Sequence, residues 1–142
     1  MNAAIIVAAG KGTRMGPNVD KLWLKVAGRP VIAHTWQRFE DAASIGEIIV
    51  VVRDGMQIHF TELAAMFHFQ KPFRIVIGGE ERQDSVCNGL TALSLATEIV
   101  AIQDAARPCT TEMLINATIE AARATGAAVA AQPVTDTIKE SG

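Results

Sequence analysis

The chain has 142 residues, 49% of them hydrophobic and 20% charged, which suits one α/β domain over residues 1–142 with a core of its own. No apolar run approaches the roughly 18 residues that span a membrane, and the N-terminus lacks the basic region and cleavage site of a secretory signal, so we expect a cytoplasmic protein without a membrane partner. The formal net charge of −2 combines a basic N-terminal stretch with an acidic remainder. Binding to nucleic acid requires a basic stripe with stacking aromatics, so we expect no nucleic-acid partner.

Strand and helix patterns alternate along the chain. Apolar or β-branched runs predict strands at 3–8, 47–52, 73–77, 98–102 and 127–134. Helical spacing of apolar residues predicts helices from Pro30 to about 42, through 58–67, from about Arg82 to 93, and from about Thr111 to 124, with Gly126 as the last cap. We expect the third of these helices to bury Val86, Leu90 and Leu93.

This order of elements predicts an α/β fold with a doubly wound, mostly parallel sheet of the Rossmann-like type. Strands that are apolar on both faces need helices on both sides, which gives three layers. Ligands of such sheets bind outside the carboxyl ends of the strands, where the strand order reverses. We expect the glycine-rich loop after the first strand, the Gly78-Gly79 pair and Asp104 to converge there.

The first strand runs into the loop Gly10–Gly16, which holds three glycines and two cations, Lys11 and Arg14. Accessible backbone N–H groups and positive charge are what a polyphosphate needs, and Lys21 adds a third cation. The spacing fits neither the dinucleotide fingerprint, whose third glycine would replace Met15, nor the P-loop. We interpret the loop as a nucleotide-phosphate cradle; the alternative is a tight strand-to-helix turn.

Arg14 and Lys21 are candidate catalytic cations. Attack on a phosphoryl group increases the negative charge on its equatorial oxygens and on the departing pyrophosphate, and cations already in place stabilise that state more than the ground state. Composition alone does not separate them from surface charges such as Lys25 and Arg29.

Asp104 directly follows an apolar strand, so its carboxylate would lie at the edge of the sheet, where it can hold Mg²⁺ against phosphate oxygens. The small Ala105 and Ala106 leave room beside it. The alternative is that Asp104 caps a turn, with Arg107 as its ion partner.

The segment Gly78–Ser85 is a candidate base site. The two glycines let the backbone approach a flat base, and the Ser85 hydroxyl at the start of a helix could bond a base edge. The alternative is a helix start whose acidic first turn suits the helix dipole.

Three motifs together resemble the 2-C-methyl-D-erythritol 4-phosphate cytidylyltransferase family: Ala8–Met15 followed by Lys21, Gly78–Val86, and Asp104–Pro108. The resemblance covers essentially the whole chain, down to Pro133–Lys139. It implies a nucleotidyltransferase fold and transfer of a cytidylyl group from CTP to methylerythritol phosphate. It also implies a requirement for Mg²⁺, release of pyrophosphate, and a place in the non-mevalonate route to isoprenoid precursors.

The resemblance also implies roles for single residues. Arg14 and Lys21 match the transition-state stabilisers, and Asp104 matches the metal-binding aspartate. Nucleotide contacts carry over to Ala8, Ala9, Gly10, Gly12, Gly79, Glu80, Ser85 and Ala105, of which Gly79, Glu80 and Ser85 match the groups that recognise cytosine. Arg107 and Thr137 match positions near the acceptor phosphate.

Members of the family are considerably longer, and the part without a counterpart here would hold a dimerisation arm and further active-site residues. The resemblance therefore implies a homodimer for the intact enzyme and little or no catalysis by the 142-residue chain. Two alternatives stay open: a cytidylyltransferase acting on ribitol 5-phosphate, which shares fold and mechanism, and a module that binds CTP without transferring anything.

Overall fold

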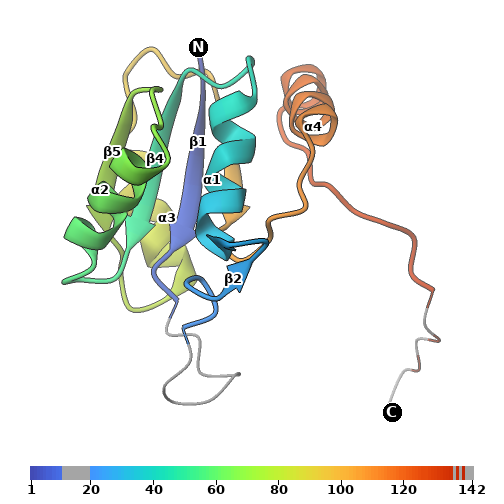
Figure 1. Cartoon of the computed structure of the whole chain (residues 1–142). Helices are drawn as coiled ribbons and strands as arrows, with labels where there is room; N and C mark the ends of the chain where they lie inside the picture. Colours follow the sequence, from blue (N-terminus) through green and yellow to red (C-terminus); the bar gives the residue numbers. More distant parts are fainter. Residues whose placement is uncertain (11–19, 136, 138, 140–142) are drawn as a thin grey trace.

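The protein is described here by a computed structural model that covers residues 1–10, 20–135, 137 and 139 (Figure 1). Its main sheet consists of β1 (Asn2–Ala8), β4 (Glu47–Val52), β5 (Phe73–Ile77) and β6 (Ile99–Asp104), all parallel. The spatial order is β5-β4-β1-β6. The chain thus builds outward from β1 in one direction and then returns to its other side, so the strand order reverses between β1 and β6, as a doubly wound fold requires.

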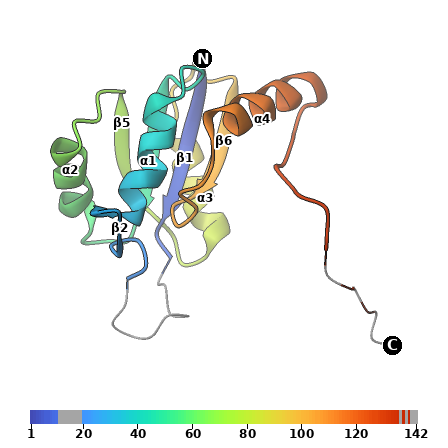
Figure 2. The ribbon, with the colours of Figure 1, turned by 45° about the vertical axis from the view of Figure 1, so that its right-hand side comes forward.

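Helices cover both faces of this sheet and give the three predicted layers (Figure 2). α1 (Val31–Asp41), α2 (Gln57–Met66) and α4 (Glu112–Thr125) contribute to the larger core cluster on one face. α3 (Arg82–Thr91) lies against β1 and β4 on the other. A short antiparallel pair, β2 (Lys25–Val26) and β3 (Arg29–Pro30), precedes α1.

The side chains of β1 and β4 pack alternately into the two sides of the sheet. Ile6 and Val50 join Trp36 of α1 in the larger core cluster, whereas Ile5 and Val51 belong to the smaller cluster on the α3 side. All five are fully buried. Burial on both faces explains why these strands read as continuous apolar runs.

The predicted strand at 127–134 is wrong. In the structure this segment is exposed, forms no strand and runs away from the end of α4 (Figure 1). Gly126 does cap α4 in the left-handed conformation, with φ 89°, as predicted. Alanine and valine give the segment strand-like composition, but a strand also requires a neighbour with which to pair, and this segment has none in the described chain.

The predicted burial on α3 is also partly wrong. Leu90 is 44% exposed, and the buried residues of this helix are Ser85 and Gly89. A Cβ at Gly89 would lie 2.9 Å from Ile5 Cγ2, so the helix contacts the sheet through its small residues. The large apolar residue Leu90 therefore does not identify the face of α3 that packs against the sheet.

None of the helices in the described residues is long and apolar enough to cross a membrane.

Glu47 is a buried acid at the start of β4, with 8% of its side chain exposed. Oε1 accepts hydrogen bonds from the Ser94 N–H at 2.8 Å and the Thr97 hydroxyl at 3.3 Å, and Oε2 accepts from the Arg74 guanidinium at 3.1 Å. Burial by itself would raise the pKa of Glu47. The hydrogen bonds and the charge of Arg74 outweigh burial and hold that pKa below its ordinary value.

We expect Glu47→Gln to lower the free energy of unfolding by about 1–3 kcal/mol at neutral pH, because the buried carboxylate loses its charge and its hydrogen bonds weaken. The pKa of Glu47 is lower in the folded than in the unfolded protein, so the extra stability of the wild type over Glu47→Gln is fully present above the unfolded pKa of about 4.3. This extra stability should disappear as the pH falls through the lower pKa of the folded protein. Urea unfolding across this pH range measures both effects.

As a control, Glu98→Gln removes a carboxylate that is 65% exposed and should change stability by less than about 0.5 kcal/mol. A change in Glu47→Gln no larger than this would contradict the prediction.

Candidate functional site

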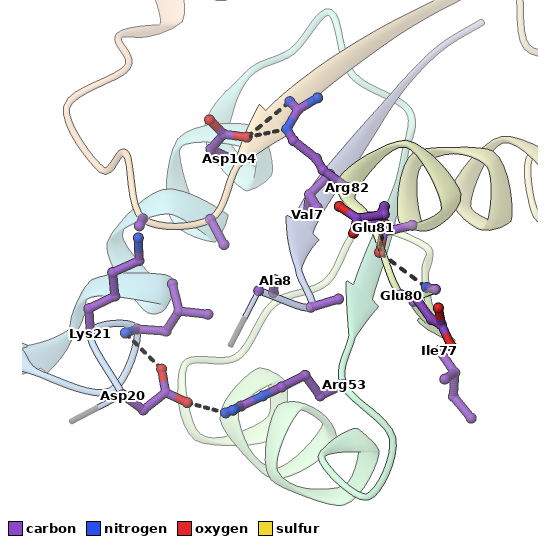
Figure 3. Close-up of a pocket in the computed structure, with 18 of the residues that line it drawn as sticks. Val7, Ala8, Asp20, Lys21, Arg53, Ile77, Glu80, Glu81, Arg82 and Asp104 are labelled. Atoms are coloured by element: carbon purple, nitrogen blue, oxygen red, sulfur yellow. Dashed lines mark hydrogen bonds and ion pairs between the residues drawn. The ribbon is translucent and has the colours of Figure 1, made fainter. Parts of the chain in front are cut away.

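The carboxyl ends of the sheet strands open on a cleft of about 950 Å³. It lies beside the point where the strand order reverses, as predicted from the fold class. Ten of the predicted site residues line it: Ala8, Ala9, Gly10, Lys21, Gly79, Glu80, Ser85, Asp104, Ala105 and Arg107. Segments that are far apart in the sequence thus meet in one place (Figure 3).

Three predicted site residues are not in this group. Gly12 and Arg14 lie outside the described residues. Thr137 is exposed and is not among the residues that line the cleft. The expectation that Thr137 lies near the acceptor came from the resemblance alone.

The loop after β1 and the turn after β5 are in direct contact. A Cβ at Gly78 would lie 2.5 Å from Ala9 Cβ and 2.7 Å from Ser85 Oγ, which is too close for any residue larger than glycine. Gly10 lines the cleft, and no atom of the described residues lies within 4 Å of its Cβ position. Gly78 is therefore required for close packing, whereas the described residues do not impose this requirement at Gly10.

Ser85 holds the turn after β5. Its hydroxyl accepts a hydrogen bond from the Gly79 N–H at 3.1 Å and donates to the Glu81 carbonyl oxygen at 3.2 Å, and the residue is 2% exposed. Since the one hydroxyl proton is used within the protein, only an acceptor lone pair is left for a ligand. The Asp84 carboxylate accepts from the Glu81 N–H at 3.0 Å, as part of a capping box at the start of α3, so an acid of this first turn has a structural role.

Asp104 lies between two arginines. Nε and Nη2 of Arg82 donate to Oδ1 at 3.1 and 3.0 Å (Figure 3). Nε of Arg107 donates to Oδ2 at 3.1 Å. Burial alone would raise the pKa of Asp104, but the hydrogen bonds and charges of the two arginines hold it below its ordinary value. Asp104 thus lines the cleft and also has Arg107 as its ion partner, so the two interpretations of this residue are compatible.

The side chains of the cleft that could coordinate a metal ion are few. The described residues contain no group of three or more His, Cys, Asp or Glu side chains placed to bind one. Asp104 contributes a single carboxylate, and Mg²⁺ is commonly bound by one or two carboxylates together with substrate phosphates. The residues therefore fit an ion shared with a nucleotide, and they do not form a complete metal site of their own.

Five charged residues of the cleft were not predicted as site residues: Asp20, Arg53, Asp54, Glu81 and Arg82. Arg53 follows the last residue of β4, and Arg82 is the first residue of α3. Both positions lie at the carboxyl edge of a parallel sheet, which was the signal available in the sequence. Their partners, Asp20 and Asp104, come from distant parts of the chain and could not be read from spacing.

Comparisons with known proteins agree with this geometry. A family model described as IspD: 2-C-methyl-D-erythritol 4-phosphate cytidylyltransferase matches residues 2–142. A relative with that enzyme name from Alkaliphilus oremlandii is 46% identical over 139 residues, which cover 96% of this chain and 58% of the relative. Another from Pelotomaculum thermopropionicum is 43% identical over 141 residues, with 99% and 59% covered.

A solved structure leads to the same family. The crystal structure of 4-diphosphocytidyl-2C-methyl-D-erythritol synthase from Anaerococcus prevotii is 32% identical and superposes with a TM-score of 0.75, over 87% of this chain and 51% of that one. The chain thus spans about 60% of the length of the curated relatives that it matches. From the whole-length match and the residues gathered in the cleft, the chain belongs to the 2-C-methyl-D-erythritol 4-phosphate cytidylyltransferase family.

Proposed function

We propose that this chain supplies the nucleotide-binding part of an enzyme that transfers the cytidylyl group of CTP to 2-C-methyl-D-erythritol 4-phosphate and releases pyrophosphate. The observation that carries the proposal is the convergence of the Ala8–Gly10 loop, the Gly78-Gly79 turn, Lys21 and Asp104 on one cleft. Family membership gives the reaction, and this cleft supports it with the groups a nucleoside triphosphate needs. Isoprenoid precursor synthesis is the corresponding metabolic role.

In this proposal the two loops bind the donor nucleotide. The backbone at Gly10, which carries no side chain, can approach the phosphates, and Lys21 adds a point charge beside them. The turn that Ser85 holds, with Glu80, is where the cytosine would lie. The loop contact at Gly78 fixes the distance between the phosphate and base regions.

Arg82 and Arg107 are 61% and 77% exposed, so their ion pairs with Asp104 are weak surface interactions. We propose that phosphate oxygens replace Asp104 as partners of these arginines. The freed Asp104 carboxylate would then hold Mg²⁺, which when bound neutralises phosphate charge and orients the triphosphate.

The chemical step is an in-line attack of an acceptor phosphate oxygen on the α-phosphorus of CTP, with pyrophosphate as the leaving group. Lys21, together with Arg14 by resemblance, stabilises the added negative charge. No general base is needed, because a phosphate monoester with its second pKa near 6 is already ionised at neutral pH. In keeping with this, no histidine lines the cleft in the described part of the chain.

The homodimer is proposed from the resemblance, and the cytoplasmic location is proposed from the expectation made on the sequence. Light scattering measures the first, and fractionation of cells that produce the protein measures the second.

Activity measurements distinguish the proposed reaction from its two alternatives. We expect the 142-residue chain to bind CTP with Mg²⁺ and to release pyrophosphate far more slowly than a full-length relative, with methylerythritol phosphate as the preferred acceptor. Release only with ribitol 5-phosphate would contradict the proposed acceptor. Binding of CTP with no release for any acceptor would identify this chain by itself as a binding module.

Asp104→Asn should abolish the gain in CTP affinity that Mg²⁺ provides, a loss of about tenfold or more, because the carboxylate charge is what holds the ion. Without Mg²⁺ the same variant should bind CTP as tightly as the wild type or more tightly, since one negative charge has left the cleft. Titration calorimetry with and without Mg²⁺ measures both affinities. Asp41→Asn at the far end of α1 is the control. An unchanged response of Asp104→Asn to Mg²⁺ would exclude this residue as the ligand.

Ser85→Ala should lower the preference for CTP over UTP by about tenfold, or roughly 1.4 kcal/mol. The substitution removes the acceptor of the Gly79 N–H, so the turn beside the base is free to shift. Competition between the two nucleotides measures the preference. Ser94→Ala, which alters a serine outside the cleft, serves as the control. If the preference survives in Ser85→Ala, neither the hydroxyl nor the turn that it holds contributes to the choice between CTP and UTP.

A further inference from the structure

The turn that carries Lys21 is tied to a distant strand. Asp20 precedes Lys21 and forms an ion pair with Arg53, the residue after β4 (Figure 3). The other carboxylate oxygen of Asp20 accepts the N–H of Leu22 at 3.1 Å, and the Asp20 carbonyl oxygen accepts the N–H of Trp23 at 3.0 Å. The Asp20 and Arg53 side chains are 28% and 35% exposed, so the pair is partly shielded from water.

The same turn is anchored on its other side by the core. Leu22 is 6% exposed and belongs to the larger core cluster. Its carbonyl oxygen accepts the N–H of Ile32 at 3.1 Å, and the Leu24 carbonyl oxygen accepts the N–H of Val31 at 3.0 Å, both at the start of α1. Lys21 therefore lies between a hydrophobic anchor and an ion pair, and the backbone from which it extends is held from both directions.

We infer that Asp20 and Arg53 are positioning residues for Lys21. The ion pair fixes the backbone beside Lys21 against the end of β4, and so limits where the flexible lysine side chain can place its ammonium group. The inference rests on the proposed function, in which Lys21 binds the triphosphate of the nucleotide.

A simple charge effect and a positioning role predict opposite changes in nucleotide affinity when Asp20 is removed. Asp20 is a carboxylate in a cleft proposed to bind a polyanion, so by charge alone its removal should strengthen nucleotide binding. If Asp20 positions Lys21, its removal should weaken binding instead. Loss of Arg53 weakens binding in both cases, because it removes a cation. Asp20 is therefore the informative residue.

The experiment measures CTP binding in the presence of Mg²⁺ by calorimetry for the wild type, Asp20→Ala, Lys21→Ala and the double variant. We expect Asp20→Ala to weaken binding by about tenfold, as a displaced binding group does. In the Lys21→Ala background the same substitution should cause no further loss, since residues that act through one another are not additive. Asp41→Ala, an exposed acid at the end of α1, is the matched control.

Each outcome decides a separate point. Binding by Asp20→Ala as tight as the wild type, or tighter, would overturn the positioning role, and so would an equal loss in both backgrounds. A wild type that does not bind CTP would overturn the proposed function and this inference together. Asp20→Asn, which keeps an acceptor for the Leu22 N–H but removes the charge, should weaken binding in the same direction, and it replaces Asp20→Ala if that variant does not fold.

Discussion

The position of β1 determines where the rest of the cleft lies. This strand has parallel hydrogen-bonded neighbours on both sides, and its residues Ala3, Ala4, Ile5 and Ile6 have no exposed surface. It can be neither shifted nor rotated without disturbing both core clusters. The loop that begins at Ala9 therefore starts from a fixed point, and the turns after β4, β5 and β6 are placed relative to it by backbone register.

Three of the arginines and two of the acids that line the cleft are paired with one another. Asp104 is held by Arg82 and Arg107, and Asp20 is held by Arg53. Arg82 and Arg107 are largely exposed, so their pairs with Asp104 contribute little to stability and, in the proposed function, can be exchanged for phosphate at small cost. The Asp20–Arg53 pair is more shielded from water, which suits a role in holding the backbone.

The sequence contained the framework of the fold and most of the cleft. Runs such as the one ending in Ile5 and Ile6 are recognisable because residues buried on both faces show no alternation. The segment 127–134 has similar composition, yet strand formation depends on a partner that composition does not reveal. The glycine turns and Asp104 could be placed because parallel strands end at one edge. The pair between Arg82 and Asp104 joins residues from different elements, and the side-chain partners of Ser85 depend on backbone geometry, so neither could be derived from spacing.

The two sides of the cleft differ in how firmly they are held. β6, which carries Asp104, has β1 on one side and no strand on the other within the described chain, and its Ile102 is 46% exposed. Edge strands open locally at lower free energy than strands in the middle of a sheet. Ala9 and Gly10 therefore extend from a strand that is paired on both sides, while the carboxylate proposed to hold the metal sits on an edge strand. A local opening of β6 would move Asp104 relative to Ala9 and Gly10.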